Sequence, residues 1–307
     1  MITVDFLETS ACTQPLLFAV VAARYHGKWL YCRHKARTTR ELPGGHIEAG
    51  ETAADAAARE LFEETGALRF DLQPICIYRV TTEKEVSHGM LYFAEVTSMD
   101  TIPASSEMAE VGLYDTPPED QTYPEIQPEL FNRTLLYLYE QKTANELWDV
   151  LDGDRNPTGR TARRGDMPLP AGDYHLVVHV WVQNSRGEFL LTRRTPNKAF
   201  PLMWEVTGGS AVSGDNSLHA ALREIREETG FRLRPESGQL LFSEKRRDNF
   251  LDVWLFRADL DLRDAVLQPF ETCDICWATE EQLHSMQKGG VLAPIAYLDK
   301  VLEKVRS

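Results

Sequence analysis

The apolar and polar positions of the chain follow the same order in its two halves. Each half opens with two apolar runs that are rich in β-branched and aromatic residues and bounded by polar segments, as is typical of strands. The runs are "LLFAVVAARY" and "KWLYC" in the first half, and "HLVVHVWVQN" and "EFLLT" in the second. Later apolar runs predict more strands, and each half closes with a predicted amphipathic helix, at residues 128–141 and 293–305.

A Gly-Gly turn followed by a helix lies between the early and late strands of each half. In the first half Thr52, with Asp55 three residues later, has the pattern of an N-cap, and Gly66 is placed as a C-terminal cap. Strands and helices that alternate in this order predict an α/β fold for each half. The predicted architecture is an α/β/α sandwich with a mixed β-sheet.

The two halves are copies of one another. Gly45 aligns with Gly209 at an offset of 164 residues, and the same offset aligns "RELFEETG" at Arg59 with "REIREETG" at Arg223. Because the repeat covers a whole set of strands and helices, it predicts a domain duplication and not a short repeat array. We expect a first domain at residues 1–144 and a second domain at residues 145–307.

Each repeated helix ends with three carboxylates on one face, because their spacing is i, i+3, i+4. They are Glu60, Glu63 and Glu64 in the first copy, and Glu224, Glu227 and Glu228 in the second. Mutual repulsion and the negative end of the helix dipole both disfavour this arrangement. A solvated acidic face is the alternative interpretation, but an unfavourable pattern that occurs twice indicates a bound cation. Hard divalent ions accept oxygen ligands, so Mg2+ or Mn2+ is the predicted cofactor.

The two repeated segments resemble the Nudix box. Its pattern is Gly, five residues, Glu, seven residues, Arg-Glu-aliphatic-any-Glu-Glu-any-Gly and an aliphatic residue. Residues 45–67 match it with Ala67 as the last residue, and residues 209–231 match it with Asp215 in place of Glu and with Phe231 last. The first domain is similar to small nucleoside triphosphate pyrophosphohydrolases. The second is similar to the Nudix branch that includes isopentenyl-diphosphate isomerase.

The resemblance implies a role for each residue of the motifs. The implied metal ligands are Glu60, Glu63, Glu64 and the Gly44 carbonyl in the first domain, and Glu224, Glu227, Glu228 and the Gly208 carbonyl in the second. The implied catalytic residues are Glu60, Arg59 and Glu51, and Glu224, Arg223 and Asp215. Glu60 and Glu224 are each either a further ligand or the general base. The arginines orient the carboxylates, and the remaining acids support the site from the loop before the helix.

Nudix enzymes often take one more acid from a later loop. The candidates are Glu107 and Glu110 in the first domain, and Glu271 and Asp274 in the second. Each of them could equally be an ordinary loop acid, so the choice among them stays open.

The resemblance implies metal-dependent hydrolysis of the diphosphate linkage in nucleoside di- or triphosphate derivatives, including oxidised ones such as 8-oxo-dGTP. Isopentenyl-diphosphate isomerase activity in the second domain is one alternative. The active-site cysteine of that isomerase belongs in the turn after Trp204, where this chain has Thr207, Gly208 and Gly209. A nucleotide-binding sensor without catalysis is the other alternative. It would usually have an eroded motif, whereas both motifs here are nearly intact.

Charge and composition limit the kinds of partner and the cellular location that we expect for the protein. A formal charge of -14 disfavours a basic groove for polymeric nucleic acid, and a small phosphorylated substrate is expected instead. No apolar run is long enough to span a membrane, and no signal peptide is recognisable. Five scattered cysteines, Cys12 among them, are expected to be reduced thiols. We therefore expect a cytoplasmic protein, and its oligomeric state is not predicted.

Overall fold

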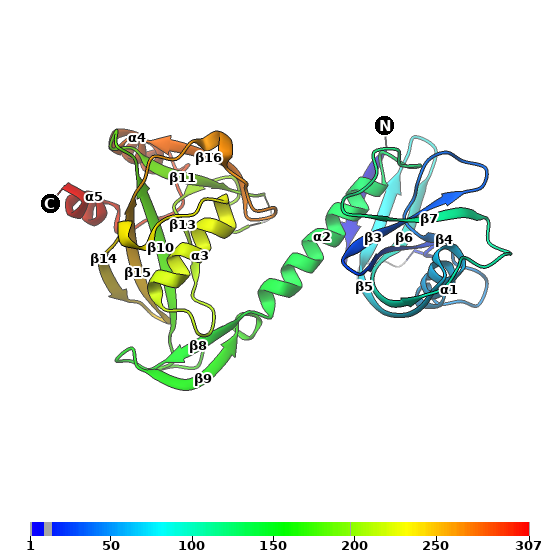
Figure 1. The fold of residues 1–307 in the computed structure, drawn as a ribbon, viewed down its shortest axis with the longest axis horizontal. Helices are drawn as coiled ribbons and strands as arrows, with labels where there is room; N and C mark the ends of the chain where they lie inside the picture. Colours follow the sequence, from blue (N-terminus) through cyan, green and yellow to red (C-terminus); the bar gives the residue numbers. More distant parts are fainter. Residues whose placement is uncertain (1, 9–13, 197, 307) are drawn as a thin grey trace. The chain divides into compact units, whose positions relative to one another are not determined.

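The chain folds into two compact units, Met1–Leu138 and Tyr139–Ser307. The computed structural model describes residues 2–8, 14–196 and 198–306. The units meet within helix α2 (Gln127–Ala144), which begins in the first unit and ends in the second (Figure 1). The boundary between the two units lies after Leu138. The domain limit expected from the sequence was slightly later, after residue 144.

The first unit contains a mixed seven-stranded sheet with the strand order β1-β5-β6-β2-β3-β7, in which β4 pairs with β2. β2 and β6 are parallel, and the other pairs are antiparallel. The strands are β1 Thr3–Leu7, β2 Phe18–Tyr25, β3 Lys28–His34, β4 Gly44–His46, β5 Ala67–Thr81, β6 Val86–Met99 and β7 Met108–Tyr114. The mixed sheet expected from the sequence is confirmed.

Helices cover both faces of this sheet. Helix α1 (Ala53–Thr65) buries Ala57 and Leu61 in one apolar cluster with Val21. On the opposite face Leu130 and Phe131 of α2 pack in a second cluster, where the rings of Phe131 and Trp29 lie 4.7 Å apart between centroids. Alternate residues of a strand point to opposite faces, which is why β2 contributes to both clusters. The first unit is thus an α/β/α sandwich.

The second unit repeats this plan. Its mixed sheet has the strand order β12-β11-β10-β15-β14, with β13 pairing with β10 and β16 pairing with β11. β10 and β15 are the parallel pair, as β2 and β6 are in the first unit. The strands are β10 His175–Gln183, β11 Phe189–Arg194, β12 Trp204–Glu205, β13 Thr207–Ser210, β14 Gly238–Lys245, β15 Asn249–Arg257 and β16 Thr272–Ala278. A separate hairpin, β8 Leu147–Leu151 and β9 Pro157–Arg163, precedes the sheet.

Three helices cover the sheet of the second unit. Helix α3 (Ser217–Thr229) buries Ala221 and Ile225 against one face, and helices α4 (Glu280–Lys288) and α5 (Leu298–Arg306) cover the other. The closing helix was expected at 293–305 but starts at Leu298. The residues before it run beside β12, since Ala293 donates its backbone N–H to the Trp204 carbonyl at 2.7 Å. Helix α4 was not predicted.

Helix α1 begins at the N-cap that the sequence predicts, and both repeated helices, α1 and α3, end at the predicted glycine. The Thr52 hydroxyl accepts the backbone N–H of Asp55 at 3.2 Å and forms a capping box with that residue. Gly66 and Gly230 end the two helices with φ angles of 76° and 77°, the left-handed conformation that glycine adopts at little cost. These caps fix where each helix stops and hence where its last carboxylates lie.

The structure can be compared with the expected state of the cysteines and with the expected lack of a membrane-spanning segment. Cys32, Cys76, Cys273 and Cys276 are free thiols, whereas Cys12 lies outside the described residues. In the part of the chain that the structure describes, every helix is either too short or too polar to cross a membrane.

Candidate active sites

Arg59 holds the carboxylates of the first motif together. Its guanidinium binds Glu51 through two hydrogen bonds, Nε to Oε1 at 2.7 Å and Nη2 to Oε2 at 3.0 Å. Its Nη1 also lies 2.8 Å from Glu60 Oε1 and 3.3 Å from Glu63 Oε2. Charge-assisted bonds of this kind fix the direction of a carboxylate. The structure therefore brings together four residues of the first motif that were singled out from the sequence.

Glu64 is the buried carboxylate of the first motif. It is 8% exposed, and its Oε2 accepts the backbone N–H of Gly44 at 2.9 Å. Burial raises the pKa of Glu64 to about 8, and the nearby carboxylates of Glu60, Glu41 and Glu63 add to the effect. Gly44 therefore contacts the site through its N–H, whereas its carbonyl was the group expected to bind metal.

The glycine that opens each motif gives room to a carboxylate. A Cβ on Gly45 would collide with the carboxylate of Glu60, and a Cβ on Gly209 would collide with that of Glu224. A larger residue at either position would therefore displace that carboxylate. Burial is also the main reason why the pKa values of Glu60 and Glu224 are raised, that of Glu224 to about 7.

Arg223 occupies the same central place in the second motif. It contacts Asp215 Oδ2 at 2.9 Å, Glu224 Oε1 at 2.9 Å and Glu227 Oε2 at 3.1 Å. It also donates to the carbonyl of Ser210 at 2.9 Å. The pair with Asp215 is a single hydrogen bond from Nε, whereas Glu51 accepts two from Arg59. The shorter side chain of Asp215 explains this difference between the two sites.

Glu228 carries the least satisfied oxygen of the second site. The residue is 4% exposed, and its Oε2 has no hydrogen-bond partner among the described residues. Burial raises the pKa of Glu228 to about 8, Lys198 opposes the shift, and the carboxylates of Glu224 and Glu205 add to it. A buried carboxylate oxygen without a partner is costly unless a cation or a proton accompanies it.

The donor atoms of both sites fit a hard divalent ion. Several carboxylate oxygens are crowded together in each site, and in the second site one of them, Glu228 Oε2, is buried without a partner among the described residues. Mg2+ and Mn2+ accept such oxygen ligands. Within residues 2–8, 14–196 and 198–306, however, no three His, Cys, Asp or Glu side chains are already grouped to hold a metal ion. Arg59 and Arg223 engage the carboxylates instead.

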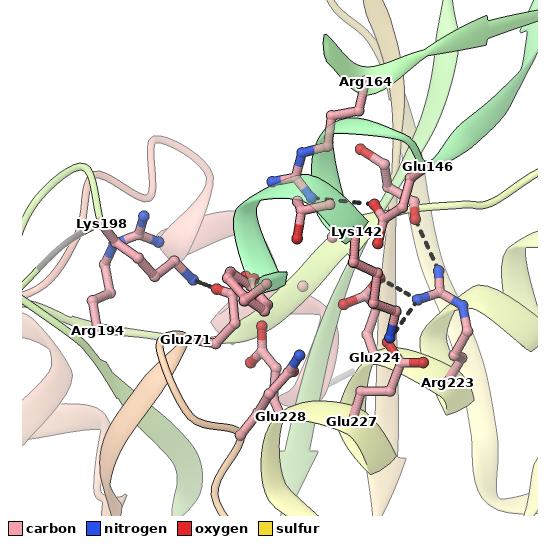
Figure 2. A pocket seen from close by; sticks show the side chains of 16 residues that line it. Lys142, Glu146, Arg164, Arg194, Lys198, Arg223, Glu224, Glu227, Glu228 and Glu271 are labelled. Atoms are coloured by element: carbon pink, nitrogen blue, oxygen red, sulfur yellow. Dashed lines mark hydrogen bonds and ion pairs between the residues drawn. The ribbon is translucent and has the colours of Figure 1, made fainter. Parts of the chain in front are cut away.

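A pocket of about 180 Å³ adjoins the second motif. Figure 2 shows its charged lining. The acids are Glu146, Glu224, Glu227, Glu228 and Glu271, and the bases are Lys142, Arg164, Arg194, Lys198 and Arg223. Gly208 and Gly209 also line it, so the residues expected from the second motif border one cavity, except Asp215, which contacts Arg223 instead. A pocket with cations beside carboxylates suits an anionic substrate that binds together with metal.

The later acids fall into two groups. Glu271 lines this pocket with a side chain that is 15% exposed and forms an ion pair with Lys198. Asp274 is exposed, and its Oδ1 accepts the backbone N–H of Ile275 at 2.8 Å. In the first unit Glu107 is 85% exposed and lies 3.4 Å from His34, and Glu110 pairs with Arg33 at 3.0 Å.

Sequence reasoning missed Arg194 and Lys198, which line the second pocket, and also Glu205, which contacts both of them. Arg194 and Lys198 both form ion pairs with Glu205. Glu205 has a counterpart in the first unit at the same offset of 164 residues: Glu41, which is 7% exposed and bound by Arg37 at 2.7 Å. That repeated acid was a signal in the alignment. The cations gave no such signal, because those that pair with Glu41 and those that pair with Glu205 are not separated by the common offset of 164 residues.

Several known proteins are similar to this chain in sequence. The model of the NUDIX domain family matches residues 14–145 and residues 173–297. An uncharacterized Nudix hydrolase of Listeria innocua is 34% identical over 160 residues, which is 52% of this chain and 94% of that protein. A putative 8-oxo-dGTP diphosphatase of Bacillus subtilis, YtkD, is 39% identical over 80 residues, 26% of this chain and 50% of that protein.

A crystal structure of the Deinococcus radiodurans protein DR0079 is similar at 24% identity with a TM-score of 0.43, over 52% of this chain and 98% of that one. The family match extends over both repeats and includes both carboxylate motifs. The chain therefore belongs to the Nudix family and contains two Nudix domains in tandem.

Proposed function

We propose that each domain hydrolyses the diphosphate linkage of a nucleoside di- or triphosphate derivative and requires Mg2+ or Mn2+. The observation that carries the proposal is a repeated cluster in which one arginine binds three carboxylates and a fourth carboxylate of the same motif, Glu64 or Glu228, is buried. The divalent ion would neutralise charge on the phosphoryl oxygens and lower the pKa of the attacking water. We propose Glu63 and Glu64, and Glu227 and Glu228, as the residues that hold it.

The protein's own side chains contribute orientation and proton transfer. Arg59 and Arg223 keep the carboxylates directed toward one another through charge-assisted bonds. Glu60 and Glu224, each packed against a glycine, are either further ligands or the bases that accept the proton of the attacking water. The buried positions of Glu64 and Glu228 exclude water from one side of each cluster.

We propose oxidised nucleotides such as 8-oxo-dGTP as substrates of one domain. The partial match to the putative 8-oxo-dGTP diphosphatase of Bacillus subtilis supports this substrate class. A second, different substrate is expected for the other domain, because the segments that flank the motifs differ far more than the motifs do. The formal charge of -14 favours small phosphorylated substrates over polymeric nucleic acid, and we propose that the protein works in the cytoplasm.

Phosphorus NMR of the products, in water labelled with oxygen-18, tests this function. A panel of nucleoside triphosphates that includes 8-oxo-dGTP should give a monophosphate and pyrophosphate, only when Mg2+ or Mn2+ is present. A variant with both Glu63→Gln and Glu227→Gln is the control and should be inactive. Release of orthophosphate alone from a triphosphate would contradict the proposed linkage. Tight nucleotide binding without any metal-dependent turnover would indicate a sensor.

Asp215→Glu is expected to increase kcat of the second domain. The longer side chain can accept a second hydrogen bond from Arg223, as Glu51 does from Arg59. A hydrogen bond to a charged group is worth about 1.5–3 kcal/mol, of which part should appear as a roughly threefold to tenfold rise in kcat. Glu51→Asp is the matched variant and should lower kcat of the first domain by a similar factor. If only Glu51→Asp has an effect, the single contact of Asp215 is already sufficient.

A further inference from the structure

The last turn of helix α2 forms part of the pocket of the second domain. Tyr139, Lys142 and Thr143 line this pocket together with the carboxylates of the second motif (Figure 2). These residues come from the end of the helix that links the two domains, before the region of the second family match. The linker helix therefore supplies part of the wall of the second site.

Contacts on both sides hold this turn in place. The rings of Tyr139 and Phe270 lie 5.9 Å apart between centroids. Just beyond the helix, the carbonyl of Glu146 accepts the backbone N–H of Arg164 at 2.9 Å, and the two side chains form an ion pair at 3.3 Å. Both contacts are made within the second compact unit. The turn is thus fixed beside the carboxylates by groups that neighbour the pocket.

Most cations of the pocket already have a carboxylate partner. Arg223 binds Glu224 and Glu227, as described above. The remaining pairs are Arg164 with Glu146, Lys198 with Glu271, and Arg194 with Glu205. Lys142 differs from them, because no carboxylate oxygen in the described part of the chain lies within 4.0 Å of its Nζ.

An exposed lysine without a carboxylate partner at the edge of this pocket is suited to bind phosphate. A diphosphate group carries several negative charges, and a metal ion held by carboxylates neutralises only part of them. Lysine brings a compact positive charge on a flexible stem with three donors, so it can reach phosphate oxygens beyond the metal. The other function of a lysine at this position is to interact favourably with the negative end of the helix dipole.

We propose that Lys142 binds phosphate oxygens of the substrate of the second domain, so that the linker helix supplies a substrate-binding residue to that site. This inference rests on the proposed diphosphate chemistry. It goes beyond that chemistry because the residue lies outside both motifs. It also predicts that the second domain needs the end of α2 for tight substrate binding but not for the chemical step.

Binding of imidodiphosphate with Mg2+ to the full-length chain, measured by calorimetry, tests the proposal without turnover. A background of Glu63→Gln and Glu64→Gln weakens the first site, so that the second dominates. Lys142→Ala is expected to weaken binding about tenfold, as befits the loss of one charge-assisted contact. Lys142→Arg should retain most of the affinity, because it keeps the charge.

Lys288→Ala is the matched control. Lys288 is also an exposed lysine in the last turn of a helix, α4, but it does not line the pocket. It should leave imidodiphosphate binding unchanged, and Lys142→Ala should leave the affinity for Mg2+ alone unchanged. With a substrate from the nucleotide panel, Lys142→Ala should raise KM about tenfold and change kcat less than about twofold.

The possible outcomes separate this inference from the proposed function. If the Lys142→Ala variant binds imidodiphosphate as tightly as its parent, Lys142 is not a phosphate ligand, and the proposed hydrolysis is unaffected. An equal loss of affinity in Lys142→Ala and Lys288→Ala would indicate a general effect of net charge and also overturn the inference. If the parent itself fails to bind imidodiphosphate with Mg2+, the proposed function of the second site fails and the inference fails with it.

Discussion

Glu63→Gln is expected to abolish turnover by the first domain and to leave turnover by the second domain unchanged. Gln keeps the shape of the side chain but replaces a charged metal ligand by a neutral amide. Loss of a group that only supports a metal ligand costs about 10- to 100-fold, so loss of the ligand itself should lower kcat/KM by more than about 100-fold. Glu227→Gln should have the converse effect.

The contacts of each motif are the reason to expect independence. Among the described residues, every ion-pair partner of Arg59 belongs to the first compact unit, and every ion-pair partner of Arg223 belongs to the second. Neither cluster needs a residue of the other unit to complete its set of carboxylates. The prediction therefore treats the two domains as separate enzymes on one chain.

Steady-state rates on the nucleotide panel test whether the two domains act independently. Substrates lost by Glu63→Gln are assigned to the first domain, and substrates lost by Glu227→Gln to the second. Glu303→Gln, an exposed carboxylate on α5, controls for the change in net charge. If either motif variant alone silenced every substrate, the two domains would not be independent.

The carboxylate clusters were predictable from the sequence because local rules determine them. Helical spacing places Glu60, Glu63 and Glu64 on one face, and the capping residues Thr52 and Gly66 set the limits of the helix. The duplication helped as well, since an unfavourable charge pattern seen twice indicates a function. The two mixed sheets followed from the order of strands and helices for the same reason.

The choice among the later acids was not predictable, because it depends on strand register. β16 pairs with β11 so that Asp274 lies opposite Arg193, but Arg194 lies opposite Thr272, which is a bulge of one residue. Glu271 directly precedes the bulged end and lines the pocket, whereas Asp274 is exposed in the paired part of the strand. No local sequence signal distinguishes these two acids.

The cations of the second pocket were missed for a related reason. Lys142 is far from the motif in the chain and belongs to a helix that packs at its other end in the first domain. Lys198 lies in a loop and is directed by ion pairs with Glu205 and Glu271. Such long-range pairs follow from tertiary structure and leave no periodic pattern. Helix α4 is different, because its capping box at Thr279 and Gln282 could have been recognised.

Glu228→Gln is expected to stabilise the metal-free second domain while it abolishes activity there. In the wild type a buried carboxylate lies near Glu224 and Glu205, and its Oε2 has no partner among the described residues. Gln keeps the shape and removes the charge that burial penalises. Attraction by Lys198 offsets part of the penalty. We expect a gain of about 1–3 kcal/mol, or about 2–4 °C in the melting temperature for each kcal/mol.

The raised pKa of Glu228 makes the stability difference between Glu228→Gln and the wild type depend on pH. The pKa of Glu228 is about 8 in the folded state and about 4.5 in the unfolded chain, so the folded state holds the proton more tightly. Protonated Glu228 therefore contributes its full stabilisation to the folded wild type below about pH 4.5. The wild type loses this contribution as the pH rises through about 8. The neutral Gln loses none of it. The advantage of Glu228→Gln should be absent near pH 4.5 and grow up to about pH 8.

Thermal denaturation in EDTA and in Mg2+ tests this account of the buried charge. In EDTA at pH 8 Glu228→Gln should unfold at a higher temperature than the wild type, whereas Glu227→Gln should differ little, because that side chain is already 36% exposed. Mg2+ should raise the melting temperature of the wild type more than that of Glu228→Gln, since the variant lacks a ligand for it. A lower melting temperature for Glu228→Gln in EDTA would mean that Lys198 and its neighbours already compensate the charge. The carboxylate would then contribute to the stability of the folded domain, and not oppose it.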